Sequence, residues 1–501
     1  MSLAGSPGSP GSPGSPGSPG SPGSPGSGPA AGPDMAAVTA LLGRAPEGAF
    51  EVVVRDEGGE PVVLRNAPLL ADGRPMPTRY WLVGRRLQAA VGRLESGGGV
   101  REAAAAVDPA ALAEAHRRYA AERDGAVPAG HEGPRPSGGV GGTREGVKCL
   151  HAHLAWYLAG GDDPVGAWVA GRLAAEAPEL GPVVAAVDCG SNSTRLLVSA
   201  GASLPLARRM RITRLGEGVD ATGRLAPAAV GRTLEVLAGY ARLVGELGAT
   251  AVRVVTTSAS RDAANAEALL GPASELLGVV PEVLEGEEEG RLAYLGATRD
   301  LAPWSGPFLV VDLGGGSTEL VAGGPPGRPA AAVSLAVGCV RVTERFLAGD
   351  PPSGEGLAAA RSYVADLVGE AVAAHPELAA PPSVVTVAGT SAVLAALAAG
   401  LERYDRARVH LARLDRSTVE ALAARLAAAT LEERRALLAV EPARAEVIAG
   451  GAVALAAVLG ALGRVASVHS EADILDGLVL DLSRGLLPGA GGRCGGGPGA
   501  G

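Results

Sequence analysis

The sequence has few aromatic residues, almost no lysine and few asparagines, and each shortage narrows its interpretation. Only 3% of the 501 residues are aromatic while 47% are hydrophobic, so a buried core must consist mainly of Ala, Val and Leu. Lys148 is the single lysine among 44 basic residues, and asparagine occurs only as Asn66, Asn192 and Asn265. This skew is typical of a GC-rich genome, which makes each retained Lys or Asn a candidate for a specific role.

Several functional classes are disfavoured by what is missing. The four cysteines, at 149, 189, 339 and 494, lack the paired spacing of a disulfide framework or a zinc motif. The chain does not open with the basic and apolar regions of a signal peptide, so we expect a cytoplasmic protein. A net charge of -9 disfavours non-specific nucleic-acid binding. The uncharged stretch from Val447 to Gly463 is short and rich in Ala and Gly, which predicts a buried core helix and no membrane span.

Composition divides the chain into five segments. Residues 1–34 are dominated by Gly-Ser-Pro repeats and are predicted to be disordered, with Met35 an alternative start. Residues 36–177 form a small α+β domain in this prediction. Residues 183–304 and 305–486 alternate strand and helix patterns, which indicates two α/β domains. The Gly-rich residues 487–501 are predicted to be disordered.

One pattern occurs twice in the α/β part. The apolar runs at Val183–Val187 and Phe308–Val311 each lead to an Asp, then a Gly/Ser/Thr turn, then another strand. The two turns are Asp188-Cys189-Gly190-Ser191-Asn192-Ser193-Thr194 and Asp312-Leu313-Gly314-Gly315-Gly316-Ser317-Thr318-Glu319. Such turns direct backbone N–H groups and hydroxyls into a concavity that binds phosphate oxygens. The Asp at each strand end is suited to Mg²⁺ (or Mn²⁺), which prefers oxygen ligands. The sequence therefore predicts two phosphate loops that face each other between two domains.

Two further segments lie between these loops. Gly286-Glu287-Glu288-Glu289-Gly290-Arg291 has an acidic helix start, where Glu is favoured by the helix dipole. Beside phosphate loops, one of these carboxylates becomes a candidate general base for water. The segment Thr256–Asp262 stands at a strand-to-helix junction, where Ser260 is a candidate cap and Arg261 a candidate phosphate ligand.

These segments resemble one known family. VAAVDCGSNSTRLLV (184–198), TTSASRDAAN (256–265), EGEEEGRLA (285–293) and VVDLGGGSTELV (310–321) are similar to the Ppx/GppA phosphatases. VAGTSAVL (387–394), RAEVIAGGA (444–452) and SEADILDGL (470–478) agree with them. The resemblance covers about Pro182 to Leu486 and implies two actin/hexokinase-like (ribonuclease H-like) ATPase domains with a cleft between them. It implies an exopolyphosphatase that releases orthophosphate from inorganic polyphosphate.

The resemblance also implies residue roles. Glu289, directly before Gly290-Arg291, would be the catalytic glutamate, with Glu288 as the alternative, and Glu319 would lie near the metal or the attacking water. The metal ligands would be Asp188, Asp312 and Glu319. The phosphate ligands would be Gly190, Ser191, Asn192, Ser193, Arg195, Arg261, Gly314, Gly315, Gly316, Ser317, Thr318 and Arg444.

Three alternatives stay open at this point. The chain could hydrolyse guanosine pentaphosphate, or it could bind guanosine tetraphosphate, guanosine pentaphosphate or polyphosphate as a regulatory module with little turnover. A sugar-kinase-like transferase shares the fold, but no Asp is placed to bind an acceptor. Neither nucleic acid nor membrane is expected as a partner, and a homodimer is left open.

The N-terminal segment resembles a different family. PLLADGRPMPTRY (68–80) and GGVGGTREGVKCLHAH (138–153) are similar to the domain-of-unknown-function 501 family, a name that implies no activity. Cys149, His151, His153 and His116 suggest a metal site. A helix predicted over Arg144–Leu158 would put 151 nearly opposite 149 and 153, so structural packing is the favoured interpretation. Lys148, the single lysine, stands beside them and is a candidate contact for an anion or a partner.

Overall fold

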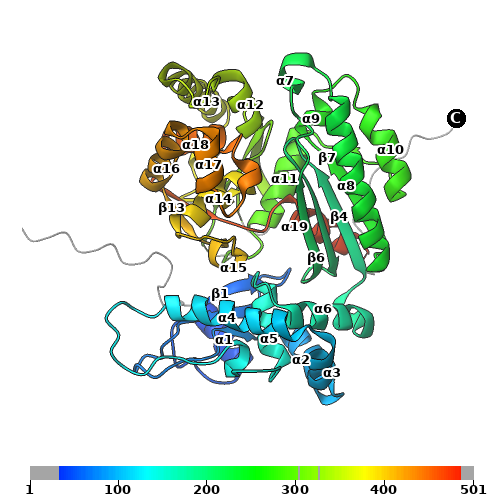
Figure 1. Cartoon of the computed structure of the whole chain (residues 1–501), viewed down its shortest axis with the longest axis vertical. Helices are drawn as coiled ribbons and strands as arrows, with labels where there is room; N and C mark the ends of the chain where they lie inside the picture. Colours follow the sequence, from blue (N-terminus) through cyan, green and yellow to red (C-terminus); the bar gives the residue numbers. More distant parts are fainter. Residues whose placement is uncertain (1–32, 303–304, 325–327, 487–501) are drawn as a thin grey trace, which may run out of the picture.

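The computed structural model of the chain describes residues 33–302, 305–324 and 328–486, which form three units (Figure 1). The N-terminal unit spans residues 33–180, and two lobes built around one β-sheet each follow it. The tails predicted at 1–34 and 487–501 lie outside the described residues, except that Pro33 and Asp34 open helix α1 (Pro33–Leu42).

The N-terminal unit packs helices on an antiparallel sheet of order β1-β2-β3. Its strands and helices are β1 (Phe50–Arg55), β2 (Pro61–Asn66), β3 (Tyr80–Leu82), α2 (Arg85–Ser96), α3 (Gly99–Ala106), α4 (Pro109–Gly125), η1 (Val140–Gly142), α5 (Leu150–Leu158), α6 (Pro164–Glu176) and η2 (Pro178–Leu180). The helix predicted from Arg144 begins only at Leu150. Cys149 before it is extended, and Gly146 has a φ of +65°, which a continuing helix does not allow.

The first lobe has a sheet of order β6-β5-β4-β7-β8. Strands β4, β5 and β6 form an antiparallel meander, while β7 and β8 continue the sheet in parallel. Its elements are β4 (Val183–Cys189), β5 (Ser193–Ala200), β6 (Leu204–Ile212), α7 (Val219–Thr222), α8 (Pro227–Glu246), β7 (Ala251–Thr256), α9 (Ser258–Arg261), α10 (Glu267–Leu277) and β8 (Glu282–Val283).

The second lobe repeats this topology in a sheet of order β11-β10-β9-β12-β14-β13. An antiparallel meander of β9, β10 and β11 is followed by the parallel strands β12 and β14, and β13 adds an antiparallel edge. Its elements are β9 (Phe308–Leu313), β10 (Thr318–Gly324), β11 (Arg328–Leu335), α12 (Cys339–Phe346), α13 (Gly354–Ala374), η4 (Pro376–Ala379), β12 (Ser383–Val387), α14 (Ala388–Ala398), α15 (Arg406–Val409), β13 (Arg413–Asp415), α16 (Arg416–Ala428), α17 (Leu431–Leu437), η5 (Pro442–Arg444), α18 (Ile448–Ala461) and β14 (Ala466–His469).

Helix α18 lies in the core of the second lobe. Its apolar residues, among them Ile448, Val453 and Leu455, belong to the largest buried cluster. The uncharged stretch at 447–463 is therefore a core helix, as the sequence predicts. Within the described ranges, none of the helices combines the length and hydropathy needed to cross a membrane.

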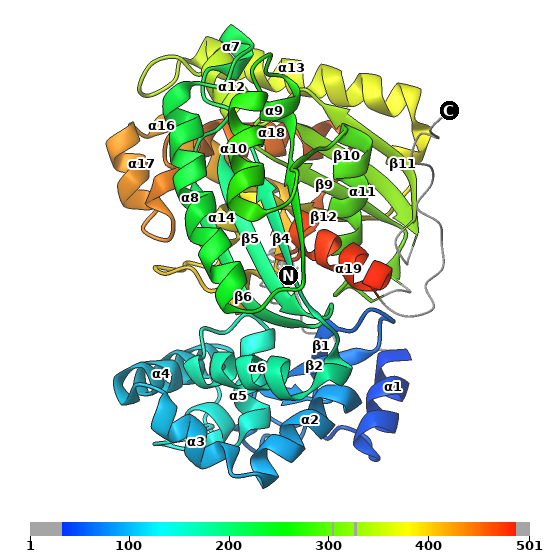
Figure 2. The same ribbon diagram turned by 90° about the vertical axis from the view of Figure 1, so that its right-hand side faces the viewer.

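Two helices join the lobes at their contact. Helix α11 (Gly286–Ala297) follows the first sheet in the chain but packs on β10 and β11 of the second. Helix α19 (Ile474–Leu486) ends the segment predicted as the second domain, yet it packs on β4 and β5 of the first sheet. Figure 2 shows α19 beside α11 where the lobes meet. Apolar residues of both helices and of the first sheet share one buried cluster, so each lobe completes its core with chain from the other half.

The contact between α11 and α19 requires glycine. A Cβ at Gly296 would stand 1.8 Å from the carbonyl oxygen of Asp473, and one at Gly477 would stand 2.0 Å from that of Leu292. Both neighbours are backbone atoms that a side-chain rotation cannot move away. The absence of a side chain at these two positions therefore sets the distance between the helices.

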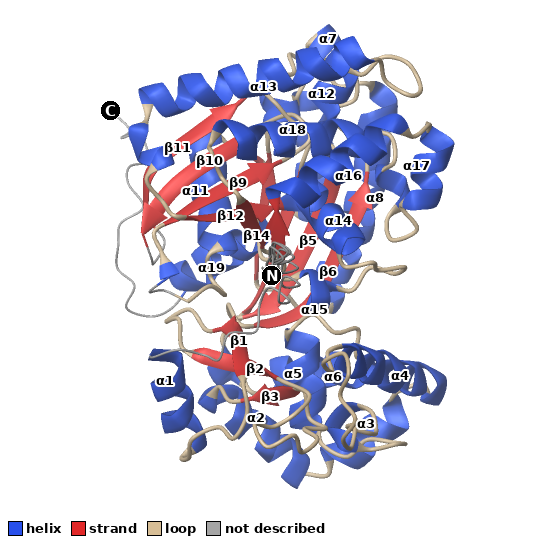
Figure 3. Cartoon of the chain, turned by 90° about the vertical axis from the view of Figure 1, so that its left-hand side faces the viewer, coloured by secondary structure: helices blue, strands red, loops and turns tan. Residues whose placement is uncertain are grey.

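The N-terminal unit contacts both lobes and lies below them in two perpendicular views (Figures 1 and 3). The hydroxyl of Tyr157 on α5 donates to the carbonyl of Pro205 on β6 at 3.0 Å. Arg65 of β2 donates to the carbonyl of Ala407 on α15, also at 3.0 Å. Leu204 of the first lobe belongs to the core cluster of the N-terminal unit. The interface thus has a shared apolar core as well as polar contacts.

We predict that Gly477→Ala lowers the thermal unfolding midpoint, because the new methyl group would overlap a main-chain oxygen. Overpacking of this kind costs about 1–3 kcal/mol and occasionally more. The matched control is Gly369→Ala in α13, where an added Cβ meets nothing within 4 Å. That control should be neutral or slightly stabilising because Ala favours helix. Equal midpoints for Gly477→Ala and the wild type would contradict the close helix contact.

Candidate active site

The two predicted phosphate loops have the same backbone geometry. In the first, the amide of Gly190 donates to the carbonyl of Ser193 at 3.0 Å, and in the second the amide of Gly314 donates to that of Ser317, also at 3.0 Å. Both loops connect the first two strands of a meander, which explains why one sequence pattern appears in both lobes. Equivalent loops therefore stand at equivalent places in the two sheets.

The loops lie against each other across the lobe contact. A Cβ on Gly315 would stand 2.9 Å from the Cβ of Ser191, and one on Gly316 would stand 2.6 Å from the Oγ of Ser258. Ser191 and Ser258 share a hydrogen bond of 2.8 Å between their hydroxyls. Glycine is thus needed at 315 and 316 because the opposite lobe occupies the space of a side chain.

Four carboxylates are buried around these loops. Asp188 and Glu319 are each 1% exposed, Asp312 is 7% exposed and Glu289 is 8% exposed. Asp312 and Glu319 are direct cross-strand partners on β9 and β10. In the first lobe, Arg195 is the cross-strand partner of Asp188 at the equivalent position. The partner of the repeated Asp is therefore basic in the first lobe and acidic in the second.

Burial and mutual repulsion perturb these carboxyl groups. Desolvation, followed by the charges of Glu319 and Asp312, raises the pKa of Glu289 well above its ordinary value. Desolvation and the charge of Glu319 raise the pKa of Asp312, and desolvation raises the pKa of Glu319. Desolvation likewise raises the pKa of Asp188, which Arg195 partly offsets. Titratable groups with such shifts are typical of functional sites.

Two arginines contact this group of carboxylates, and a third, Arg444, lies over Gly389 in the second lobe. The Nε of Arg195 donates to Asp188 Oδ2 at 3.0 Å. Arg261 donates to the carbonyl of Leu284 at 2.7 Å and stands 3.4 Å from the carboxylate of Glu289. The guanidinium of Arg444 lies over Gly389, where a Cβ would come within 2.0 Å of it. Gly389 follows Ala388, whose φ of +69° is unusual for a residue with a side chain.

Glu288, the alternative catalytic residue, lies in a different environment. Its carboxylate accepts two hydrogen bonds from Arg291, at 2.7 and 2.8 Å. The hydrogen bond to Arg291 lowers the pKa of Glu288, opposite to the shift at Glu289. Of the two neighbours, Glu289 is the one that joins the buried carboxylates.

The structure brings most of the expected site residues together and adds others. The hydroxyl of Thr318 already donates to the carbonyl of Val337 at 2.6 Å, so its proton is used within the second lobe. Sequence reasoning missed Ser258, Ser334 and Gly389. Ser334 donates to Glu319 at 2.8 Å from β11, a strand that the sequence did not predict. Gly389 belongs to a segment that the family resemblance included, but its close contact with Arg444 depends on tertiary structure.

A second contact zone holds the lobes together near the loops. Arg341 on α12 donates to the carbonyl of Gly316 at 2.9 Å and to Asp262 of the first lobe at 2.6 Å. Arg214, which has a φ of +51°, forms an ion pair of 2.6 Å with Glu446. These pairs hold Arg444, two residues before Glu446, beside the first lobe.

An ion-pair series runs from the first loop to the N-terminal unit. It begins at Asp188 and alternates in charge, and its last link is a main-chain amide that donates to Asp300 at 3.2 Å. Its members are Asp188, Arg195, Asp473, Arg208, Asp476, Arg299, Asp300 and the amide of Arg55. The first phosphate loop is therefore connected through helix α19 to strand β1.

The chemistry of the site fits a hard divalent cation. Its ligand candidates are carboxylate oxygens, which Mg²⁺ and Mn²⁺ prefer. Two polar atoms of the first loop, Asp188 Oδ1 and Asn192 Nδ2, are buried without a hydrogen-bond partner within the described residues. The first is an acceptor suited to a cation or its water, and the second is a donor suited to a phosphate oxygen.

Sequence comparison links this chain to two families. Residues 197–484 match the Ppx/GppA phosphatase family, and residues 52–171 match a protein family of unknown function (DUF501). The first range starts after Arg195, so the assignment of the first loop depends on its geometry. The chain is 41% identical over 317 residues to Exopolyphosphatase 2 of Mycobacterium tuberculosis, which covers 60% of this chain and 98% of that protein.

Solved structures agree with this relationship. A crystal structure of an exopolyphosphatase-like protein is 38% identical and superimposes with a TM-score of 0.57, over 61% of this chain and 100% of the other. The Aquifex aeolicus member of the Ppx/GppA protein family is 32% identical with a TM-score of 0.52, over 61% of this chain and 99% of the other. The lobes thus have the expected fold, and the N-terminal unit lies outside the region that these proteins share.

We predict that without divalent cations the protein loses stability as the pH rises. The raised pKa of Asp312 makes the folded state hold a proton that the unfolded chain releases near pH 4, about its ordinary value. The folded state therefore binds more protons, and the free energy of unfolding falls with rising pH. Thermal unfolding in chelator between about pH 5 and pH 8 measures this trend.

A matched pair of variants isolates the contribution of the buried carboxylate. Asp312→Asn should flatten the decline of the midpoint with pH, whereas Asp366→Asn on the exposed face of α13 should not. A wild-type slope retained in Asp312→Asn would show that this carboxyl group does not hold the proton.

Proposed function

The chain belongs to the Ppx/GppA phosphatase family, and we propose that it is an exopolyphosphatase, which hydrolyses the terminal phosphoanhydride of inorganic polyphosphate and releases orthophosphate. The observation that carries the proposal is the contact of two equivalent phosphate loops with four buried carboxylates around them. Backbone amides of the loops and nearby arginines suit a polyanion, while the carboxylates suit a cation and a water molecule.

The residues divide into binding and chemical roles. Backbone amides and hydroxyls of the two loops would hold the terminal phosphates, with Arg444 reaching them from the second lobe. Asp188, Asp312 and Glu319 would hold Mg²⁺ (or Mn²⁺), which when bound supplies positive charge that neutralises phosphate oxygens. Neutralisation is needed because both the substrate and the buried side chains are negative.

Glu289 is the candidate general base. A carboxylate Oε of Glu289 would accept a proton from water as the water oxygen forms a bond to the terminal phosphorus. The bond from that phosphorus to the bridging oxygen breaks, and the bridging oxygen leaves with the shortened chain. The raised pKa of Glu289 favours this role, since a base works best when its pKa approaches the operating pH.

Arg261 positions the base. Its guanidinium is fixed by the carbonyl of Leu284 at 2.7 Å, which keeps it 3.4 Å from Glu289. A positive charge at that distance stabilises the ionised form of Glu289 without a short hydrogen bond that would hold the carboxylate away from water. Arg195 has the corresponding task at Asp188.

We predict that Glu289→Gln reduces turnover of polyphosphate by roughly 10² to 10⁴, the usual contribution of a positioned general base. The amide keeps the size of the side chain but cannot accept the proton. Binding of polyphosphate should persist or tighten, because one negative charge is removed. Phosphate release under saturating substrate, together with a binding titration, separates the two effects.

Glu288→Gln is the matched control, one residue away on the same helix. It loses the ion pair with Arg291 and a longer one with Arg253, and should retain near-normal turnover. If Glu288→Gln were nearly inactive and Glu289→Gln nearly normal, the general base would be Glu288 and not Glu289. If both variants kept full activity, neither glutamate at the start of α11 would be the general base.

We predict divalent-cation-dependent orthophosphate release from polyphosphate when it is assayed beside guanosine pentaphosphate. The two substrates share a terminal phosphoanhydride, so both fit the loops, and only the rest of the molecule distinguishes them. Cleavage of guanosine pentaphosphate alone would make the chain a guanosine pentaphosphate phosphohydrolase. Tight binding of either compound, or of guanosine tetraphosphate, without cleavage would make it a regulatory module.

A further inference from the structure

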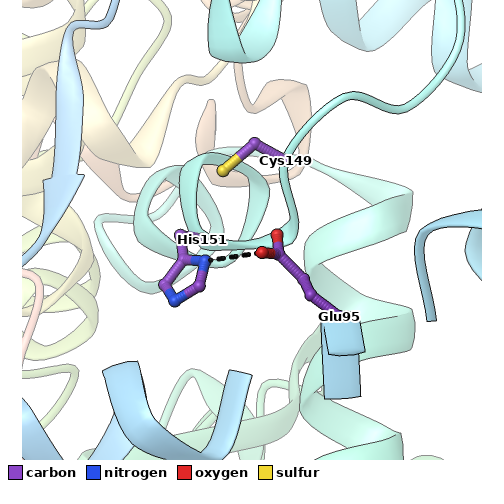
Figure 4. Close-up of side chains that lie close together, drawn as sticks. All are labelled: Glu95, Cys149 and His151. Atoms are coloured by element: carbon purple, nitrogen blue, oxygen red, sulfur yellow. Dashed lines mark ion pairs between the residues drawn. The ribbon is translucent and has the colours of Figure 1, made fainter. Parts of the chain in front are cut away.

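A group of side chains outside the phosphatase site has the composition of a metal centre. Glu95 on α2 lies beside Cys149 and His151 at the start of α5, and Figure 4 shows the three converging. One potential ligand atom from each residue lies within 4.8 Å of the other two. The expectation that Cys149 and His151 face opposite ways was wrong, because Cys149 is extended (φ −151°) and precedes the helix.

The two neighbouring histidines have structural roles instead. His153 is fully buried, and its Nδ1 pairs with Asp163 at 2.6 Å. His116 accepts a hydrogen bond from the amide of Val140 at 3.1 Å. For these two histidines the packing interpretation holds, which leaves His151 as the histidine available to a ligand.

The hydrogen bonds of His151 orient a lone pair toward the other two residues. Its Nε2 stands 3.2 Å from the carbonyl of Gln88. A carbonyl only accepts, so we assign the ring proton to Nε2, which leaves Nδ1 as the free nitrogen of the neutral ring. Nδ1 stands 3.3 Å from Glu95 Oε2. A metal-binding histidine commonly donates its second ring N–H to a carbonyl in this way.

The carboxylate is fixed in a similar manner. Glu95 Oε1 accepts a hydrogen bond of 2.6 Å from the amide of Leu150, which leaves Oε2 directed at the imidazole. The Glu95 carboxylate, the Nδ1 of a neutral His151 ring and the Cys149 sulfur are then three potential electron-pair donors within 4.8 Å of one another. Such an arrangement needs either a proton on the ring or a cation.

We propose that Glu95, Cys149 and His151 bind a zinc-type divalent cation, with a fourth position open to solvent. Thiolate and imidazole favour Zn²⁺ over Mg²⁺ or Ca²⁺, which take oxygen ligands. The side chains of Glu95 and His151 are 27% and 28% exposed, so a cation can enter and a water molecule can complete a tetrahedron. Small rotations of Glu95 and Cys149 would bring the ligands to the roughly 2.0–2.3 Å bonds of zinc.

A metal ion and a proton would compete for the same ring nitrogen of His151. The hydrogen bond that the protonated ring donates to Cys149, with the charge of Glu95, raises the pKa of His151 to about 9. A cation would release this proton, so its affinity should rise with pH. Once bound, it would join α2 to the segment that enters α5, a segment with positive φ at Gly141, Gly142 and Gly146.

The test is a Co²⁺ titration of the full-length protein after chelator treatment. Because Cys494 is a further thiol, all samples carry Cys494→Ser. We expect a thiolate-to-cobalt charge-transfer band that saturates at one Co²⁺ per chain, apart from any Co²⁺ held by the carboxylates between the lobes. Zn²⁺ should abolish this band, and excess Mg²⁺ should not. The carboxylates of the phosphatase site contain no sulfur, and Cys189 beside Asp188 is buried with its pKa raised by desolvation, so that site should not produce the band. Absence of the band would overturn the proposal.

Variants assign the ligands. Cys149→Ser should abolish the band, and its persistence would overturn the proposal. Glu95→Gln keeps an oxygen acceptor for the Leu150 amide but loses the anionic ligand, so it tests binding in a folded protein. Its Zn²⁺ affinity, and that of His151→Asn, should fall by at least about 10- to 100-fold, since even outer-shell changes cost that much. Unchanged affinity in both would refute the site, and the partly exposed His131→Asn is the control expected to bind normally.

Discussion

The burial of four carboxylates around one point is the constraint on which the arrangement of both lobes depends. Like charges in an interior repel each other, and the raised pKa values of these groups express that repulsion. The fold offsets part of it with directed partners: Arg195 at Asp188, Arg261 at Glu289 and Ser334 at Glu319. The remaining negative charge is suited to a cation, which would reduce the repulsion that an approaching phosphate meets. The glycines at 315 and 316 permit the contact of the lobes that brings these carboxylates together.

Internal duplication explains how such a site arises. Each sheet has the same meander, and each meander places an Asp before its first turn. The cross-strand partner differs, since Arg195 faces Asp188 whereas Glu319 faces Asp312. The first lobe therefore has a carboxylate opposite an arginine, whereas the second has two carboxylates opposite each other. The site is asymmetric although the fold is repeated. The alternating ion pairs through α19 then connect the first loop to Asp300 and the N-terminal unit. In this chain the position of Asp188 depends partly on a unit that lies outside the region shared with the relatives.

Local sequence patterns were sufficient to predict the loops but not the contacts between them. An apolar run followed by Asp and a Gly/Ser/Thr turn is short-range information, and both turns form as expected. Strands β6 and β11 were missed because each follows a hairpin and carries polar residues or alanine in place of a clear apolar run. Helix α5 was predicted too early because Gly146 and the extended Cys149 interrupt an otherwise helical composition. The position of Arg444 over Gly389 and the packing of α19 on the first sheet are tertiary effects that no local pattern encodes.

The two proposed cation sites differ in ligand chemistry, and this difference determines how they can coexist. Between the lobes the ligand atoms are oxygens, in a buried setting suited to a small hard ion that must neutralise phosphate. In the N-terminal unit sulfur, nitrogen and oxygen donors converge at a partly exposed place suited to zinc. Thiolate and imidazole discriminate against magnesium, whereas the carboxylates could also accept zinc. The site in the N-terminal unit would therefore exclude magnesium, but the site between the lobes would not exclude zinc. A zinc-type site in the same chain would thus be insensitive to magnesium at levels that fill the proposed site between the lobes, while excess zinc would reach both sites.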